Sequence, residues 1–543
     1  MTSRRKIIGF MALVLALFIG MLDSTITNIA LPDIVNSFRA NLNDVSWIST
    51  IYVMGFGVFM ITAAKLADQF GRKKCMMIGL CIFGISSAMC GLSQSLIFLI
   101  VMRFIQSIGG AMISPTILPM GLALFGKAKI RIITSITGAV TALAAAGGPA
   151  LGGVIIQYIG WRGIFYVNIP LIVIALTTVA ICIKETYDNT VSKKVDFLGV
   201  VLLTATLFLL IFAFLKGQYY GWNSGLIVSM FVGSAAAFVL FILTEKKVKF
   251  PMLELGLFRE STFSASDFCY MMTGFSLVCP AVILNYFLQN ILNYTALNAA
   301  FIIMWTSVTV VISMPLGNLL AAKIGSAKPI NVLGNLIMGI GILLLSRLTV
   351  STPRSTMIFD VVICGFGMGF ACQAIVTAVK FLPVQKSGMA SGIINSMRQI
   401  GMCIGIALLV SILDVNISNA KANIKTDAIT SFDHSTVTES VQTVATKDLS
   451  LILNSNDTSE QKKLHTKMQN DIENSLAGAV KTNEIHKGAL PKQIVEIQNV
   501  MGKIIADKQQ KIADSFDGVF FIAAIILIST CFLGIFTDRK KNV

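Results

Sequence analysis

The chain has 543 residues, of which 55% are hydrophobic and only 13% are charged. Soluble globular domains carry about 25% charged residues, so this composition excludes a soluble protein. The net charge of +16 also occurs in nucleic-acid-binding proteins, and the placement of the basic residues along the chain has to decide between these classes.

Apolar runs of about 18 residues or more, long enough to cross a bilayer as a helix, recur along the whole chain. We therefore expect an all-α integral membrane protein with fourteen transmembrane helices. The first run lacks a small-residue cleavage site, so it is expected to stay as a helix and not to be removed as a signal peptide. The runs lie at 7–29, 47–67, 76–93, 96–118, 133–157, 164–183, 197–215, 225–243, 264–290, 298–322, 330–346, 356–379, 389–413 and 518–537.

The basic residues fall on one side of the expected membrane. With the amino terminus inside, the cytoplasmic segments hold most of them, including Arg72, Lys129 and Lys194, whereas the short outer connections hold few. This positive-inside distribution predicts that both termini are cytoplasmic and argues against a nucleic-acid partner. The ten cysteines lie in or beside the spans at no metal-ligand spacing, and the three histidines lie in one polar segment, so no metal site is expected.

The first span carries a polar stripe in LDSTITNIALP at 22–32. Asp23 and Thr27, and likewise Ser24 and Asn28, stack one helical turn apart. An ionisable group inside a bilayer costs about 2.5 kcal/mol or more, which makes it a functional candidate. We expect Asp23 to bind and release a proton beside Thr27 and Asn28 in a substrate cavity. The alternative is that Asp23 only bonds Thr27 or a helix end.

The connection after the second span reads AKLADQFGRKK at 64–74. Gly71 permits a tight turn, and Asp68 can pair with a basic residue such as Arg72 or cap a neighbouring helix. A loop that only satisfied the positive-inside rule would need neither the acid nor the glycine. We therefore predict that Asp68, Gly71 and Arg72 form a conformational latch.

The fourth span contains RFIQSIGGAM at 103–112, in which Arg103 and Gln106 share one helix face. An arginine in the middle of a span must face the protein interior and find an acceptor there. We expect Arg103 to take part in proton coupling and Gln106 to face the cavity. The alternative is a purely structural pairing.

The fifth span is built almost wholly of small residues and reads GPALGG at 148–153. In lipid, small faces matter because they let helix backbones approach closely, and a proline amid glycines bends a helix. We predict that Gly148, Pro149, Gly152 and Gly153 form a moving joint.

The spans fall into groups along the chain. Their order predicts a six-helix half at 1–195, two inserted helices at 196–245 and a second six-helix half at 246–543. NLLAAKIGSAK at 318–328 echoes the 64–74 segment at the matching place of the second half. Parallel repeats of this kind are typical of transporters whose halves rock about a central site.

Two later spans add polar groups. Asp360 is the only other acid well inside a span, whereas Asp267 lies near a cytoplasmic end and is expected at the interface. The thirteenth span reads SGIINSMRQIGMCIG at 391–405 and carries Asn395 and Arg398 in a glycine-spaced helix. We therefore add Asp360 to the proton-coupling candidates, and Asn395 and Arg398 to the residues expected around the substrate cavity.

One long segment, 414–517, is polar, and the alternation of the spans places it outside the cell. Apolar residues recur at helical spacing from Leu464 to Leu476 and again from Ile494 to Ile512. We therefore expect at least two amphipathic helices in this extracellular insert. A solvated cap that packs on itself is the simplest interpretation; a substrate gate and a partner-binding site are the alternatives.

Five motifs, taken in order, resemble the signature set of the major facilitator superfamily: Asp23 to Pro32, the 64–74 segment, Arg103 to Gly110, GPALGG, and WRGIFYVNIP at 161–170. The resemblance is to the fourteen-helix drug:H+ antiporter branch, of the QacA and EmrB type, and it covers the whole membrane part. Within that superfamily, GPxxGG marks antiporters. The length of the 414–517 insert is more similar to Gram-positive members than to those that dock a periplasmic adaptor.

The resemblance implies proton-coupled efflux of lipophilic drugs or toxic compounds across the cell membrane by alternating access. Asp23 would exchange the proton, Arg103 would tune the cavity, and the fifth span would let the halves rock. The proton gradient would take the place of a cofactor, and an enzyme is not expected, since the sequence has no GxxxxGK[ST] loop for ATP. The expected partners are a small lipophilic substrate, protons and the bilayer, with the protein acting as a monomer.

Two alternatives stay open. The protein could export one specific metabolite or lipid, or it could be a transport-inactive receptor that binds a partner through 414–517. The retained Asp23, Arg103 and GPALGG argue against the receptor. The sequence does not identify the substrate; because carboxylates in the spans are few, it only slightly favours lipophilic cations.

Overall fold

The computed structural model describes most of the chain, and every regular element in the described part is helical. Fourteen helical segments of that part are long and apolar enough to cross a membrane, which confirms the predicted number. The described residues are 3–40, 42–188, 196–248, 255–380, 386–433 and 490–538, together with 251, 253, 382, 467, 470–472 and 474.

The first half contains six spans, and its helix ends follow local chemistry. The second helix ends at Phe70 because Gly71 adopts a φ of 121°, which residues with a Cβ rarely reach. The side chain of Ser95 caps the fourth helix by accepting a hydrogen bond from Phe98 N at 3.3 Å. The elements are α1 (Ser3–Phe38), α2 (Leu42–Phe70), α3 (Arg72–Gly91), α4 (Leu96–Phe125), η1 (Lys127–Lys129), α5 (Ile130–Ile159), α6 (Gly163–Tyr166) and α7 (Asn168–Cys182).

The second half repeats the six-span plan with more interruptions. Three of its segments, η3, η4 and η6, are π-helical, a wide turn that is rare and is often found at functional sites. The elements are η2 (Leu255–Arg259), α10 (Ser261–Val278), η3 (Cys279–Leu284), η4 (Phe287–Ile291), α11 (Ala296–Ile324), α12 (Lys328–Leu345), α13 (Arg354–Ala371), α14 (Gln373–Lys380), α15 (Ser387–Gly405), η6 (Ile406–Val410), α19 (Leu490–Thr530) and η7 (Cys531–Phe536).

Two inserted helices, α8 (Phe197–Tyr220) and α9 (Gly225–Glu245), stand between the halves in the sequence. Asp196 caps α8 by accepting from Gly199 N at 2.8 Å, and Ser224 caps α9 in the same way. α8 packs against α2 of the first half and α15 of the second. The inserted pair therefore contacts both halves.

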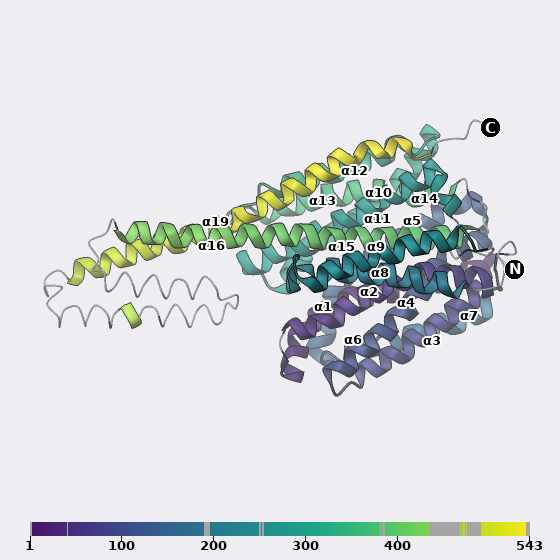
Figure 1. The fold of residues 1–543 in the computed structure, drawn as a ribbon, viewed down its shortest axis with the longest axis horizontal. Coiled ribbons are helices and arrows are strands. Elements are labelled where there is room, and N and C mark those ends of the chain that lie inside the picture. Colours follow the sequence, from purple (N-terminus) through teal and green to yellow (C-terminus); the bar gives the residue numbers. More distant parts are fainter. Residues whose placement is uncertain are drawn as a thin grey trace. The chain divides into compact units, whose positions relative to one another are not determined.

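The two halves are joined at one end of their helices, the end that carries the 64–74 segment. There α5 lies beside α11 (Figure 1). Asn318 Nδ2 near the end of α11 donates to Ser135 Oγ near the start of α5 at 2.7 Å. A Cβ added at Gly138 of α5 would meet the side chain of Met314 on α11. The halves are thus closed against each other at this end.

The chain divides into two compact units. One unit, Met1–Leu345, Pro353–Val410 and Phe520–Val543, holds the membrane helices; the other holds Ser346–Thr352 and Ser411–Val519. Within the second unit, α16 (Ser411–Asp433) packs against α19, and Asn416 Nδ2 donates to Ser515 O at 3.1 Å. Of the two helices expected in the insert, the one at 494–512 lies within α19, whereas the one at 464–476 lies largely outside the described residues.

Candidate functional site

A buried ion pair joins α1 to α4. Asp23 and Arg103 are fully buried, and Arg103 Nη1 donates to Asp23 Oδ2. Gln106, one turn further along α4, donates from Nε2 to Asp23 Oδ1 at 3.2 Å and accepts from Arg103 Nη1 at 2.8 Å. The structure thus brings three of the predicted polar residues of the first half into one cluster.

Asn168 on α7 completes this cluster, and sequence analysis missed it. Its Nδ2 donates to Asp23 Oδ1 at 2.9 Å and to Ser87 Oγ of α3 at 3.1 Å. The available signal was an asparagine in an apolar span, inside the motif at 161–170. We call Asp23, Arg103, Gln106 and Asn168 the Asp23 network.

The surroundings of the Asp23 network add further contacts to Arg103, whose Nη2 has no hydrogen-bond partner within the described residues. The Arg103 guanidinium lies 4.2 Å from the centre of the Tyr52 ring, a favourable cation–π distance. Arg103 Nε also donates to Ile48 O at 3.4 Å, which ties the network to α2. Four helices therefore meet at one buried carboxylate and its counter-charge.

The rest of the polar stripe on α1 does not join the Asp23 network. Thr27 is buried, and its Oγ1 donates to the backbone oxygen of Asp23 at 2.8 Å, not to the carboxylate. Asn28 is exposed and accepts a hydrogen bond from Ser49 Oγ at 2.8 Å. The stripe is therefore split between the interior and the surface.

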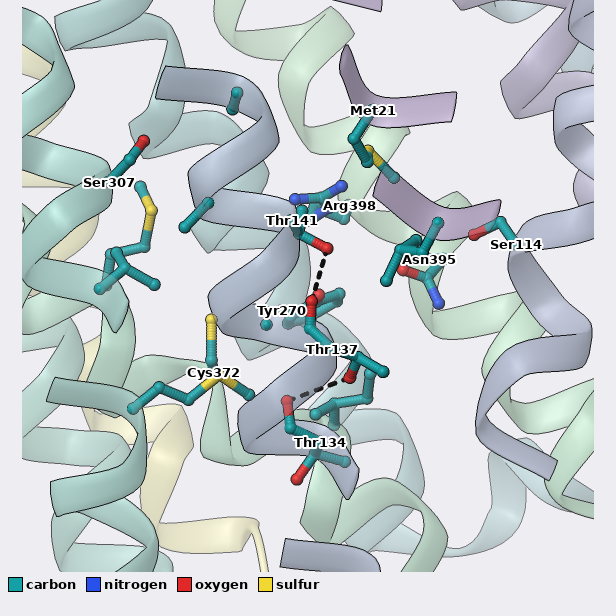
Figure 2. Close-up of a pocket in the computed structure, with 18 of the residues that line it drawn as sticks. Met21, Ser114, Thr134, Thr137, Thr141, Tyr270, Ser307, Cys372, Asn395 and Arg398 are labelled. Atoms are coloured by element: carbon teal, nitrogen blue, oxygen red, sulfur yellow. Dashed lines mark hydrogen bonds between the residues drawn. The ribbon is translucent and has the colours of Figure 1, made fainter. Parts of the chain in front are cut away.

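A cavity with an empty volume of about 950 Å³, part of which is open, is lined by helices of both halves. Figure 2 shows Thr134, Thr137 and Thr141 along α5, next to Tyr270 and Arg398. The lining residues are Leu17, Met21, Ser114, Ile117, Leu118, Thr134, Thr137, Gly138, Thr141, Ala142, Ala145, Tyr270, Leu277, Thr306, Ser307, Val310, Met314, Met368, Cys372, Ile375, Ser391, Asn395 and Arg398.

The cavity contains only part of the predicted set. Asn395 and Arg398 line it, as expected from the thirteenth span. Asp23 and Gln106 do not, because their polar atoms are engaged with Arg103 inside the first half. Thr27 and Asn28 are not lining residues either. Proton-site and substrate-site candidates are therefore separate groups of residues in this structure.

The 64–74 segment holds the two halves together. Asp68 accepts from Arg72 Nε at 2.8 Å and, across the halves, from the backbone N of Met389 at 3.0 Å. Met389 lies in the first turn of α15, where backbone N–H groups lack helical partners and attract a negative charge. Gly71 provides the turn that places Arg72 one helical turn from Asp68. These contacts fit the latch expected from the sequence.

In each half, a carboxylate that follows the last span caps the start of another helix. Sequence analysis missed both of these caps. Glu185, just after α7, accepts from the backbone N of Lys73 at 2.8 Å and of Lys74 at 3.1 Å, at the start of α3. Asp538, just after η7, accepts from Ala327 N at 2.9 Å, at the start of α12. Both halves thus tie their sixth span to the beginning of their third.

The glycines of α5 face different neighbours. A Cβ at Gly148 would meet Thr25 of α1, and one at Gly152 would lie 2.8 Å from Ile26 Cγ1. A Cβ at Gly153 would have nothing within 4 Å. The side chain of Pro149 lies outside the described part. Gly148 and Gly152 therefore pack α5 onto α1 within the first half, and α5 contacts the second half nearer its start, at Ser135 and Gly138 among other residues.

The two remaining acids of the spans are both buried. Asp360 on α13 is 4% exposed and does not line the cavity. Asp267 on α10 is 2% exposed, and neither of its carboxylate oxygens has a hydrogen-bond partner within the described residues. Asp267 is thus packed inside the protein.

Comparisons with known proteins agree with this architecture. Residues 13–406 match the model of the Major Facilitator Superfamily. The chain is 33% identical over 419 residues to multidrug resistance protein Stp of Mycobacterium tuberculosis, covering 76% of each protein. It is 27% identical over 400 residues to the tetracenomycin C resistance and export protein of Streptomyces glaucescens, covering 74% of each. A further relative is multidrug resistance protein 3 of Bacillus subtilis, 29% identical over 415 residues, with 76% of this chain and 80% of that protein covered.

Among solved structures, the human organic anion transporter MFSD10 (TETRAN) has a similar fold. The TM-score is 0.56 at 15% identity, and the match covers 76% of this chain and 94% of that one. At this identity the likeness concerns the fold alone.

Fold and motifs together define a multi-pass membrane transporter with two six-span halves and an inserted helix pair. The chain belongs to the major facilitator superfamily and, within it, to the drug:H+ antiporter family that its motifs predict. It is a transporter and not an enzyme.

Proposed function

We propose that this protein exports lipophilic drugs or toxic compounds from a Gram-positive cell by alternating access, with the proton gradient as its energy source and no further cofactor. It acts as a monomer with both termini in the cytoplasm. Relatives named for multidrug resistance and for tetracenomycin C export support the substrate class.

The observation that carries the proposal is the Asp23 network. A carboxylate with 0% exposure is held by Arg103 from α4, Gln106 from α4 and Asn168 from α7. A buried carboxylate is stable only when a counter-charge and further hydrogen bonds satisfy its oxygens. Here those partners join three helices of one half, so the charge state of the carboxylate controls how the helices pack.

Proton binding then acts through the arginine. When Asp23 takes up a proton, Arg103 loses its counter-charge, and an unpaired buried charge costs several kcal/mol. Arg103 must turn to other acceptors, of which Ile48 O is already 3.4 Å from its Nε. The helices that carry these groups shift together with Arg103, and the packing of the first half changes.

The latch controls the other step of the transport cycle, the opening of the cavity to the cytoplasm. Asp68 joins α2 to the start of α15 in this structure, and Asn318 joins α11 to α5 at the same end. With the basic loops in the cytoplasm, as the positive-inside rule requires, this closed end faces the cytoplasm. Release of these contacts opens the cavity to the inside, where substrate enters.

Uptake into inside-out membrane vesicles tests the proposal. Vesicles containing the full chain are energised with a proton gradient and offered ethidium, tetracycline and a fluoroquinolone in turn. We expect uptake of at least one compound, release of protons from the vesicle lumen during uptake, and loss of both when a protonophore collapses the gradient. Uptake that is insensitive to the protonophore would refute proton coupling. A cell lacking the protein that accumulates one compound, without wider drug sensitivity, would favour the specific exporter.

A further inference from the structure

The cavity carries charge of one sign only. Arg398 is the one aspartate, glutamate, lysine or arginine among its described lining residues, and it comes from α15. The remaining lining is apolar or carries hydroxyl, thiol or amide groups. A cation in this cavity would therefore meet an arginine and no carboxylate.

Arg398 itself lacks an acceptor. Its Nε is buried without a hydrogen-bond partner, and no ion pair or hydrogen bond of its guanidinium is found within the described part of the chain. Its guanidinium lies over the Tyr270 ring, whose centre is 5.8 Å from Arg398 Cζ. Arg72 and Arg103, in contrast, are each paired with an aspartate. A partly buried guanidinium without an acceptor is a site that a ligand can complete.

The threonines beside Arg398 leave it as the strongest donor in the cavity. Thr134, Thr137 and Thr141 of α5 donate to backbone oxygens of their own helix at 2.8–3.1 Å. Their hydroxyl hydrogens are therefore engaged. Asn395 Nδ2 likewise donates to Ser391 O at 2.8 Å.

The position of Arg398 is fixed by close helix packing. A Cβ at Gly274 of α10 would collide with the backbone oxygen of Arg398, and one at Gly401 of α15 would collide with that of Met271. α10 and α15 therefore touch backbone to backbone at this arginine and one turn beyond it. The backbone positions from which the Tyr270 and Arg398 side chains extend are therefore fixed by this packing.

We propose that the cavity binds amphiphiles with one anionic group, such as a carboxylate, sulfonate or phenolate, which Arg398 recognises while the body of the molecule lies on the apolar wall. This inference rests on the proposed function, since it takes the cavity to be the substrate site. It reverses the slight preference for lipophilic cations that the sequence gives. Arginine suits this role because its planar guanidinium binds a carboxylate through two parallel hydrogen bonds.

A matched pair of dyes tests the proposal. Fluorescein methyl ester and rhodamine 123 share the same xanthene and methyl benzoate rings, but at mildly alkaline pH the first is an anion and the second a cation. Their binding to the purified full chain is measured by fluorescence anisotropy, without any gradient. A charge-assisted hydrogen bond predicts that the anion binds about tenfold tighter or more.

Variants assign the preference to the arginine. Arg398→Gln is expected to remove the preference for the anion and to bind rhodamine 123 as tightly as the unaltered protein or more tightly. Arg398→Lys should keep part of the preference for the anion. The matched control is Arg354→Gln, which removes an exposed arginine that lies 5.0 Å from the Phe301 ring. This control substitution should leave the affinity for both dyes unchanged.

The outcomes separate this inference from the proposed function. Equal or tighter binding of rhodamine 123 by the unaltered protein, no saturable binding of the anion, or an anion preference that survives Arg398→Gln would each overturn the inference, even if vesicles export drugs. Anion-selective binding that depends on Arg398, together with vesicles that show no gradient-driven uptake, would support the inference about the cavity and refute the efflux function.

Discussion

The Asp23 network and the central cavity use the same kind of side chain in opposite ways. Arg103 is fully buried, and its guanidinium meets a carboxylate, an amide oxygen and an aromatic ring. Arg398 lines the cavity and, within the described residues, has no acceptor for its guanidinium; the centre of the Tyr270 ring lies 5.8 Å from its Cζ. A charge that is paired with a buried carboxylate is not available to a ligand. The network therefore suits coupling, and the cavity suits recognition.

The two regions should respond differently to substitution. Removing one partner of a buried ion pair costs about 3–5 kcal/mol, because the other charge is left buried alone. Removing a charge that lines an open cavity leaves no opposite charge unpaired. Stability measurements thus report on the Asp23 network, and ligand binding reports on the cavity.

The largest effect is expected for the ion pair itself. Asp23→Asn should abolish gradient-driven uptake in vesicles, and it should also lower the melting temperature of the purified protein, because Arg103 is then buried without a counter-charge. Arg103→Gln should do the same, since it leaves the Asp23 carboxylate alone among Gln106 and Asn168.

The double variant separates coupling from stability. Asp23→Asn combined with Arg103→Gln leaves no unpaired charge, so its melting temperature should recover by an amount equivalent to about 2 kcal/mol or more relative to the single variants. Uptake should stay absent, because no group is left to carry the proton. Gradient-driven uptake in the double variant would place the proton site elsewhere, and Asp360 would be the next candidate.

The small residues of α5 come next, because they hold α1, and with it Asp23, in position. Gly148→Leu should reduce transport at least tenfold and destabilise the protein by about 1–3 kcal/mol through overpacking against Thr25. Gly153→Leu is the matched control, because a Cβ there meets nothing within 4 Å. Uptake rates and melting temperatures of both variants are compared with the unaltered protein. Equal behaviour of the two would mean that the glycines are only a feature of composition.

The sequence predicted the fold well because its strongest signal, apolar length, directly sets the number of spans. It also singled out Asp23, Arg103 and Gln106, since polar groups in a span must find one another. It could not predict which neighbour each face meets. Gly148 and Gly152 contact α1 of the same half, and only the folded chain shows that Gly138, closer to the start of α5, faces Met314 of the other half.

The polar stripe on α1 shows a second limit. Successive residues of a helix are rotated by about 100°, so the row of Ser24 and Asn28 points away from the row of Asp23 and Thr27 by that angle. A single stripe in the sequence therefore became one buried row and one partly exposed row. The caps formed by Glu185 and Asp538 were missed for a different reason, because they follow the spans and join elements far apart in the chain.

A smaller effect is expected at the latch, which closes the cavity without touching it. Asp68→Asn keeps one oxygen for Met389 N but loses the charge that pairs with Arg72 and stabilises the start of α15. Uptake should fall several-fold, and a cysteine placed in the cavity, such as Thr141→Cys, should become more reactive from the cytoplasmic side. Asp33→Asn, at an exposed position of α1, is the control. Unchanged reactivity would show that Asp68 does not hold this end closed.

The smallest effect is expected at Asn28, and it tests the division of the α1 stripe most directly. Asn28 is exposed, and its side chain accepts a hydrogen bond from Ser49. At a solvated position such a bond contributes about 1 kcal/mol or less. Asn28→Ala should therefore change uptake of any exported compound by less than about twofold, whereas Asp23→Asn on the same helix abolishes it. Dye binding to the purified protein should also be unaffected, because Asn28 does not line the cavity. A strong loss of binding in Asn28→Ala would place this residue on the substrate path, as the sequence predicted, and would mean that the substrate site extends along α1 beyond the cavity around Arg398.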